Sequence, residues 1–183
     1  MNSRPRDHTW LSLEQMDAAI TQAADRGYQE VVFSGGEATL AAENLIAAMR
    51  RVQAHGLTCR LVSNAHWAHT PTEAERLVDR LIACGLAHLT VSTGDEHARF
   101  VPLTSVMTAA AAAARGLPVS IVVETALGRT ITTATLAARP ELRAIRERNP
   151  DASIDLLEGI WTPISPYQYG RYPDGWAFDH HHS

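Results

Sequence analysis

Four short apolar runs in this sequence are each followed, or ended, by residues that could bind a small molecule. The first run leads into residues 34–37, the second into Ser63 and Asn64, the third into residues 92–97, and the fourth ends at Glu124. Paired glycines let backbone groups approach a ligand closely, and carboxylates accept hydrogen bonds from an amine or a ribose hydroxyl. The residues expected to bind the ligand are Gly35, Gly36, Glu37, Ser63, Asn64, Ser92, Asp95, His97 and Glu124.

Histidines near these segments offer a second chemistry. With neighbouring carboxylates, His66, His69 and His97 could ligate a metal ion, as in a metal-dependent barrel hydrolase. They have no compact ligand spacing, and each also fits a surface or packing position. The sequence therefore assigns no metal ligand, and the hydrolase is a minor alternative.

The elements that must position these residues form a repeat of about 30 residues. Gly27, Gly56, Gly85 and Gly116 each follow a helical pattern and precede an apolar run, at intervals of 29, 29 and 31 residues. Glycine is the residue best suited to a left-handed helix C-cap, so each is predicted to end a helix. Strands are predicted at residues 31–33, 59–62, 89–91 and 119–123, with a weaker one at 154–157. Because the runs lack a clean alternation, we expect them to be buried on both faces of a parallel sheet.

Helix starts are also visible in the sequence. Ser12 with Gln15 forms a capping box, and Thr70 with Glu73 forms a second one, with Pro71 at the first helical position. Further helices are predicted at about residues 40–55, 103–115 and 134–148.

This alternation predicts one α/β domain over residues 1–183, with a core at about 12–160 and an irregular tail at 161–183. Right-handed crossovers then give a parallel sheet, either open and doubly wound or part of a (β/α) barrel. In both folds the loops after the strands meet at one edge, so we expect the candidate residues to lie together.

Composition excludes several classes of protein. The chain has a formal net charge of −4 and no basic block, so we expect no nucleic-acid partner. Its 16 basic residues are all arginine, which excludes a P-loop ATPase and a lysine Schiff-base enzyme. We predict neither a signal peptide nor a membrane span, and two cysteines give no disulfide framework, so we expect a cytoplasmic protein.

The segments after the strands resemble those of the radical SAM superfamily. Residues 31–40, VVFSGGEATL, are similar to its Gly-Gly-Glu-Pro strand and loop. Residues 61–68, LVSNAHWA, are similar to its Thr-Asn-Gly/Ala-x-Trp-Ala segment, and residues 91–102 resemble its Ser-x-Asp-x-x-His-x-x-Phe-Val-Pro segment. A weaker match is Gly170-Arg171, near the end of the chain.

The resemblance implies a partial (β/α) barrel of parallel strands, radical SAM-like or TIM-like, that binds S-adenosylmethionine. It implies that Gly35, Gly36 and Glu37 face the methionyl amine. Ser63 with Asn64, or Ser92 with Asp95, would then face the nucleoside. The resemblance leaves Glu124 at the far side of the barrel mouth.

The sequence departs from the family pattern at three places. Ala38 replaces the proline, and Gly94 stands at the aspartate position, with Asp95 displaced by one residue, which puts the ribose contact in doubt. The loop of three cysteines that binds the family's four-iron four-sulfur cluster is missing. Cys59 begins a strand and Cys84 ends a helix, so both are predicted to be packed thiols away from the site, and this chain alone cannot ligate the cluster.

The helix that begins after Ser12 matches the first helix of the family, so the first strand of the barrel is expected to be missing. Residues 31–33 then form an exposed apolar edge, which we expect a partner chain or the N-terminal segment to cover. The leading interpretation is the S-adenosylmethionine-binding barrel of a radical SAM enzyme, inactive in this chain. The alternative is a pseudoenzyme that binds S-adenosylmethionine or a partner. The substrate could be a peptide or a small molecule.

Overall fold

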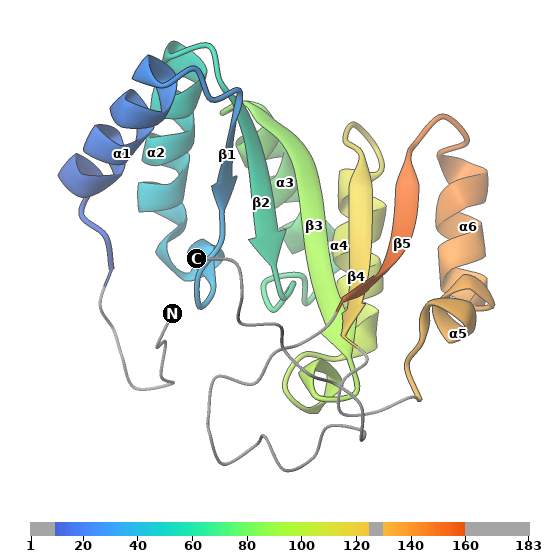
Figure 1. Ribbon diagram of the computed structural model, residues 1–183. Helices are drawn as coiled ribbons and strands as arrows, with labels where there is room; N and C mark the ends of the chain where they lie inside the picture. Colours follow the sequence, from blue (N-terminus) through green and yellow to red (C-terminus); the bar gives the residue numbers. More distant parts are fainter. Residues whose placement is uncertain (1–9, 125–129, 160–183) are drawn as a thin grey trace, which may run out of the picture.

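The fold is a single sheet of five parallel strands alternating with helices, a partial (β/α) barrel (Figure 1). The computed structural model describes residues 10–124 and 130–159. The strand order is the sequence order, so each strand pairs with the next one along the chain. The strands are β1 (Glu30–Phe33), β2 (Thr58–Ser63), β3 (Leu86–Gly94), β4 (Val119–Glu124) and β5 (Ile154–Gly159). All five therefore end at the same edge of the sheet, as the repeat predicts.

The helices pack against one face of this sheet. They are α1 (Leu13–Asp25), α2 (Ala42–Ala54), α3 (Pro71–Ile82), α4 (Leu103–Ala113), α5 (Thr133–Ala137) and α6 (Pro140–Arg148), with 3-10 turns η1 (Ala38–Ala41) and η2 (His97–Arg99). Figure 1 shows α3 and α4 behind the central strands, α1 and α2 on the β1 side, and α5 and α6 on the β5 side. None of the helices in the described parts of the chain is long and apolar enough to cross a membrane.

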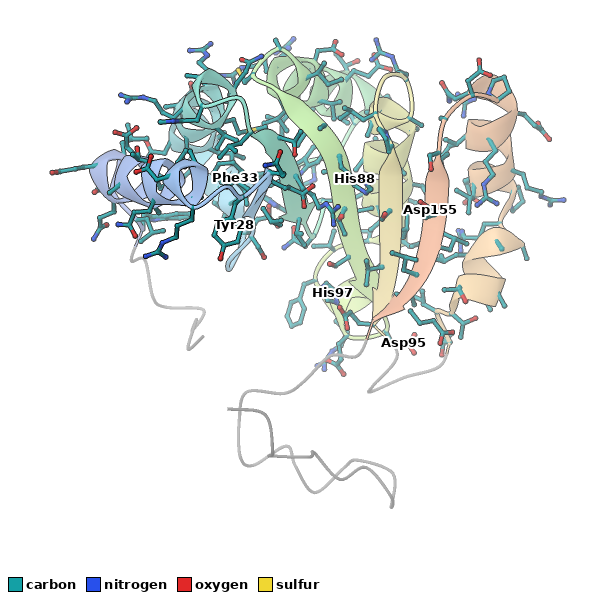
Figure 2. All side chains as sticks on the ribbon, turned by 45° about the horizontal axis from the view of Figure 1, so that its top comes forward. Tyr28, Phe33, His88, Asp95, His97 and Asp155 are labelled. Atoms are coloured by element: carbon teal, nitrogen blue, oxygen red, sulfur yellow. The ribbon has the colours of Figure 1, made fainter. Side chains whose placement is uncertain are left out.

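The expectation that the strands are buried on both faces is wrong. Along β2 buried and half-buried residues alternate: Cys59 and Leu61 point to the helices, while Arg60 and Val62 point to the opposite face. In β4, Val119, Ile121 and Val123 are completely buried beneath the helices, while Ser120 on the opposite face is also buried and Val122 is half-buried. The reason is that the helices cover only one face of the sheet. The other face, called here the open face, carries polar side chains such as Arg60 together with apolar ones such as Val32 and Val62. Figure 2 looks onto this face.

Local hydrogen bonds explain where the helices begin. In α1 the Ser12 hydroxyl accepts from the Gln15 amide at 3.1 Å, and the Gln15 side chain accepts from the Ser12 amide at 2.8 Å. At α3 the Thr70 hydroxyl accepts from the Glu73 amide at 3.3 Å. Both predicted helix starts are confirmed, but only the box at Ser12 is complete, since the Glu73 carboxylate accepts from the Thr70 hydroxyl, at 2.9 Å, and not from the Thr70 amide.

The helix predicted at residues 134–148 is instead two short helices, α5 and α6. Arg139 between them has φ −69° and ψ 134°, outside the helical region. Pro140 follows it, and the proline ring disfavours helical geometry in the preceding residue. The chain therefore breaks there and restarts with Pro140 in the first turn of α6.

Three of the four predicted glycine caps are present. Gly27, Gly56 and Gly85 have φ values of +76°, +71° and +92°. Gly116 does not have a left-handed backbone. The Leu117 amide still bonds to the Ala113 carbonyl at 2.8 Å, so helical bonding continues past residue 116 without a reversal.

Strand β1 forms one edge of the sheet, as expected for residues 31–33. Val32 is 47% exposed on the open face, while Val31 and Phe33 pack partly against the core. Residues 1–9, one of the expected covers for this edge, lie outside the described residues, as do the tail at 161–183 and its Gly170-Arg171.

Candidate functional site

Glu37 joins the loops that follow β1 and β2. Its side chain is only 8% exposed. One carboxylate oxygen accepts from the hydroxyls of Thr39, at 2.6 Å, and Ser63, at 2.9 Å. The other accepts from the backbone amide of Asn64 at 2.8 Å. Because both oxygens are used inside the protein, Glu37 positions the two loops.

Ser63 completes this connection. Besides donating to Glu37, its hydroxyl oxygen lies 2.9 Å from the donating indole nitrogen of Trp67 and 3.1 Å from the donating amide of Ala65. The side chain is 2% exposed and has no capacity left for a ligand. Ser63 is therefore a second positioning residue, and Trp67 packs against the core as a cover for it.

The loop after β2 is shaped by Asn64. Its side-chain oxygen accepts from the His66 amide at 2.9 Å and lies 3.2 Å from the His66 ring nitrogen Nδ1. This turn accommodates Ala65 with φ +64°, in the left-handed region. Asn64 is half-buried at the edge where the strands end, which leaves its amide nitrogen as a possible donor to a ligand.

The open part of the site is the glycine pair. Ser34, Gly35 and Gly36 are exposed, and a Cβ at either glycine would meet no atom within 4 Å. Gly35 has φ +134°, a conformation that other residues rarely adopt. The backbone N–H and C=O groups here are thus accessible to a ligand, next to the rigid carboxylate of Glu37.

Strand β3 brings three more candidates to the same edge. Ser92 is half-buried, and its register partner on β4 is Val122. Asp95 accepts from the backbone amides of Thr130, at 2.9 Å, and Ile131, at 3.0 Å. Asp95 therefore anchors the segment before α5, and this use competes with a ribose contact.

His97 lies beside Asp95 at the end of β3, as Figure 2 shows. Its ring is half-buried, and this burial lowers the pKa of His97 below its usual value of 6.5. The imidazole is therefore neutral at pH 7 and can act as a hydrogen-bond donor or acceptor.

Glu124 ends β4 at the same edge. Burial raises the pKa of its carboxyl group above the usual value of 4.5. Its oxygen Oε2 is buried and has no hydrogen-bond partner among residues 10–124 and 130–159. Of the nine residues expected at the site, Glu37, Ser63 and Asn64 are joined by hydrogen bonds, whereas Asp95 and Glu124 belong to separate groupings farther along the edge.

The cysteines lie at the opposite end of the strands. Cys59 is the second residue of β2 and Cys84 follows α3; both are buried free thiols, as predicted. Burial, together with the neighbouring Cys84 thiol, raises the pKa of Cys59 to about 11. Two buried thiols at the edge opposite the candidate site do not fit a four-iron four-sulfur cluster, which needs three thiolates beside the ligand.

The three candidate histidines, His66, His69 and His97, do not converge on a metal site. His69 is exposed, and His66 is held by Asn64. In residues 10–124 and 130–159, no group of three or more His, Cys, Asp or Glu side chains is arranged to hold a metal ion. The geometry gives no support to the hydrolase alternative.

Sequence reasoning missed a polar row across the open face. His88 Nε2 on β3 lies 2.9 Å from the Ser120 hydroxyl on β4, and Arg60 on β2 lies 3.4 Å from Glu30 on β1. Burial and the nearby Arg60 lower the pKa of His88. Figure 2 shows His88 and Asp155 on this face. The available signal was the period of two in β2, where Cys59 and Leu61 alternate with Arg60 and Val62.

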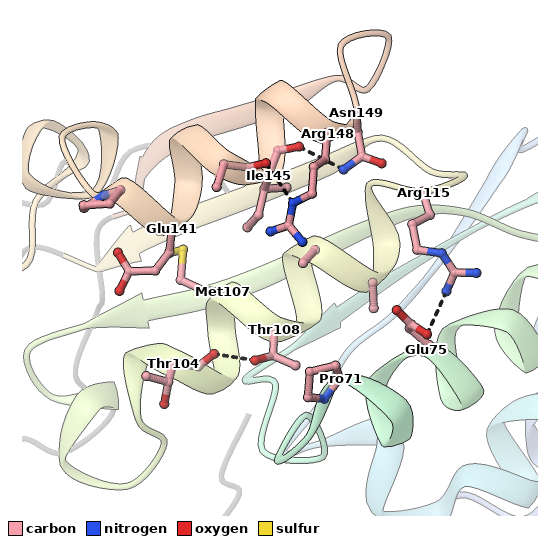
Figure 3. A pocket seen from close by; sticks show the side chains of 14 residues that line it. Pro71, Glu75, Thr104, Met107, Thr108, Arg115, Glu141, Ile145, Arg148 and Asn149 are labelled. Carbon is pink, nitrogen blue, oxygen red and sulfur yellow. Dashed lines mark hydrogen bonds and ion pairs between the residues drawn. The ribbon is translucent and has the colours of Figure 1, made fainter.

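A cavity of about 710 Å³ lies on the other side of the molecule, between α3, α4 and α6 (Figure 3). Its walls include Met107, Ala111 and Ile145, with Arg115 and Arg148 among its charged lining residues. None of the candidate site residues lines it, so it does not belong to the edge where the strands end.

Comparisons with known proteins leave the family open. No family model matches the chain, and no curated protein sequence matches it. Among solved structures, the chain is similar to the carboxyl transferase domain of Rhizobium etli pyruvate carboxylase, with 16% identity, a TM-score of 0.41, and coverage of 77% of this chain and 23% of that one. The same domain with pyruvate gives 15% identity, a TM-score of 0.42, and coverage of 78% and 25%. The chain spans about a quarter of these structures, and the likeness is too distant to carry an argument about activity.

Proposed function

We propose that this chain is an S-adenosylmethionine-binding partial barrel of radical SAM type that does not itself hold an iron-sulfur cluster. The observation that carries the proposal is the hydrogen bond from the Asn64 amide to Glu37, at 2.8 Å. It joins the two loops whose sequences resemble successive ligand-binding segments of that superfamily. The loop after β3, which resembles the third segment, ends at the same edge.

Residues of this chain can form hydrogen bonds with both the methionyl group and the nucleoside of S-adenosylmethionine. The exposed backbone carbonyls around Gly35 and Gly36 can accept hydrogen bonds from the methionyl ammonium group. Asn64, Ser92 and His97 supply neutral donors and acceptors for the nucleoside. Glu37 and Ser63 hold the loops in place, and Asp95 orders the segment before α5.

A bound four-iron four-sulfur cluster would supply the electron that cleaves the sulfonium bond. Cys59 and Cys84 do not fit this role, so we assign no reductive step to this chain. In the proposed enzyme, cluster ligands come from a partner chain or a further segment along β1. A reducing cytoplasm suits the two buried free thiols.

The alternative is a pseudoenzyme in which the barrel binds S-adenosylmethionine or a partner without chemistry. The leading form of the proposal, and the pseudoenzyme that retains the ligand, both require that S-adenosylmethionine binds to the chain as it stands. Binding alone is therefore the property to test first, and no cluster is needed for the measurement.

Isothermal titration calorimetry with S-adenosylmethionine under aerobic conditions tests the proposal. Wild-type protein is expected to release or absorb heat with a saturable, one-site isotherm. Gly36→Val should weaken binding at least about tenfold, because its side chain enters the space through which the ligand reaches the backbone. Gly116→Ala is the control, since its Cβ makes only an ordinary contact with Ile82, at 3.5 Å, on the opposite edge. No heat and no thermal shift with wild-type protein would refute the proposal.

A further inference from the structure

Glu124 stands between two glycines on the neighbouring strands. In the register of the sheet, Gly94 on β3 and Gly159 on β5 are its Cα partners. In this row of β3, β4 and β5, the carboxylate of Glu124 is therefore the single side chain, and both register neighbours are glycines. This row lies at the edge to which the candidate site belongs.

Both glycines are required by the position of Glu124. A Cβ at Gly94, which has φ +142°, would lie 2.4 Å from the Glu124 carbonyl oxygen. A Cβ at Gly159 would lie 3.0 Å from Glu124 Oε1 and 2.6 Å from Cγ1 of Val122. Any other residue at 159 would push the carboxylate away from β5, so the backbone there is shaped around it.

One oxygen of the Glu124 carboxylate lacks a hydrogen-bond donor among the described residues. Oε2 is buried without a hydrogen-bond partner, and no ion pair to Glu124 is found in the described parts of the chain. Arg99, on the segment after β3, is paired with Glu96 at 2.9 Å. A buried acceptor without a donor costs free energy, and an unpaired buried charge costs more. Burial accordingly raises the pKa of Glu124.

We infer that Glu124 binds a cationic N–H group of a ligand, an ammonium or guanidinium, at the end of the sheet. A cation with N–H donors supplies both a positive charge and a hydrogen bond to the carboxylate. A neutral group lacks the charge, and a quaternary ammonium group lacks the N–H donor. The inference extends the proposed function by assigning the substrate class at this edge: an amine or guanidine, such as a peptide side chain. It does not require that S-adenosylmethionine binds.

The test is a titration of the Glu124 carboxyl carbon by NMR, with ¹³C-labelled glutamate in the full chain. The probes are n-butylguanidinium and its neutral isostere n-butylurea, at matched ionic strength. Saturating n-butylguanidinium is expected to lower the pKa of Glu124 by about one pH unit or more, as a nearby opposite charge does. The neutral n-butylurea is expected to leave it unchanged.

Two variants test whether Glu124 is the residue that binds n-butylguanidinium. Glu124→Gln should abolish binding of n-butylguanidinium, observed by saturation transfer to the probe, whereas Glu158→Gln should preserve it. Glu158 is an exposed carboxylate on the neighbouring strand, one register position away, so it controls for the loss of charge. The inference is overturned if the pKa of Glu124 does not respond to n-butylguanidinium, if n-butylurea acts equally, or if Glu124→Gln binds the cation as wild type does. Binding of S-adenosylmethionine, measured by calorimetry, tests the proposed function separately, so the failure of one proposal can be told from the failure of the other.

Discussion

The carboxylate of Glu37, on the loop after β1, accepts a hydrogen bond from the backbone amide of Asn64, on the loop after β2, at 2.8 Å. These residues are 27 positions apart in the chain, and the parallel pairing of β1 with β2 brings them together. The contact converts two separate loops into one rigid wall of the site. Its strength can be measured directly.

Glu37→Gln should destabilise the protein by about 1 to 3 kcal/mol, because the new amide group places an N–H donor against donors that now bond to the carboxylate. The free energy of unfolding in urea measures this. Glu43→Gln removes an exposed carboxylate paired with Arg80 at 2.7 Å, and should cost less than about 1 kcal/mol. Equal effects of the two variants would show that the buried network contributes no more than a surface ion pair.

Gly94→Ala should destabilise the sheet by about 2 kcal/mol or more, because the new Cβ would meet the Glu124 carbonyl at 2.4 Å and the backbone has φ +142°. Gly36→Ala is the matched control, since its Cβ would meet nothing within 4 Å and its φ is not left-handed. Its effect on urea unfolding should stay within about 1 kcal/mol. A mild Gly94→Ala effect would mean that β3 and β4 separate easily at this row.

Cys59 should resist alkylation in the folded protein. Its pKa of about 11 leaves almost no thiolate at pH 8, and the side chain is fully buried. Iodoacetamide should label it only after unfolding in urea, as mass spectrometry would reveal.

The same shift makes stability depend on alkaline pH. The folded protein keeps the Cys59 proton up to about pH 11, whereas the unfolded chain loses it near the usual value of 9.0. Stability should therefore fall as the pH rises between these values. In Cys59→Ala this decrease should be smaller, and an unchanged decrease would exclude Cys59 as its origin.

Glu124→Gln should stabilise the protein at pH 7. The folded state raises the pKa of Glu124, so it binds this proton more tightly than the unfolded chain, and stability is lost as the pH rises through the range above 4.5. The advantage of the variant should shrink as the pH falls below 4.5, where both states of the wild type are protonated. Urea unfolding from pH 3 to 7 measures this, with Glu158→Gln expected to show no such gain at pH 7. A variant that is less stable than wild type at pH 7 would contradict the prediction.

Much of the fold could be predicted from the sequence because its signals are local. Ser12 and Thr70 start helices through bonds to residues three positions away, and Gly27 and Gly56 end helices through their own backbone freedom. The error at residues 134–148 arose where a strong helical pattern overrode the local signal of Pro140. At Gly116 the local signal itself was misleading, because the glycine does not adopt a left-handed backbone and helical hydrogen bonding continues past it.

The sequence by itself determined the alternation of strand and helix, and with it the common edge at which Gly36, Asn64 and Asp95 lie, because capping and apolar patterning act between near neighbours. Only the tertiary structure decided which candidates are free to bind and which are already occupied. Glu37 and Ser63 are hydrogen-bonded to each other, and Asp95 accepts from the amides of Thr130 and Ile131. One oxygen of Glu124 has no hydrogen-bond partner in the described parts of the chain. Hydrogen-bond partners from different strands are set by register and burial, which depend on how all five strands pack together.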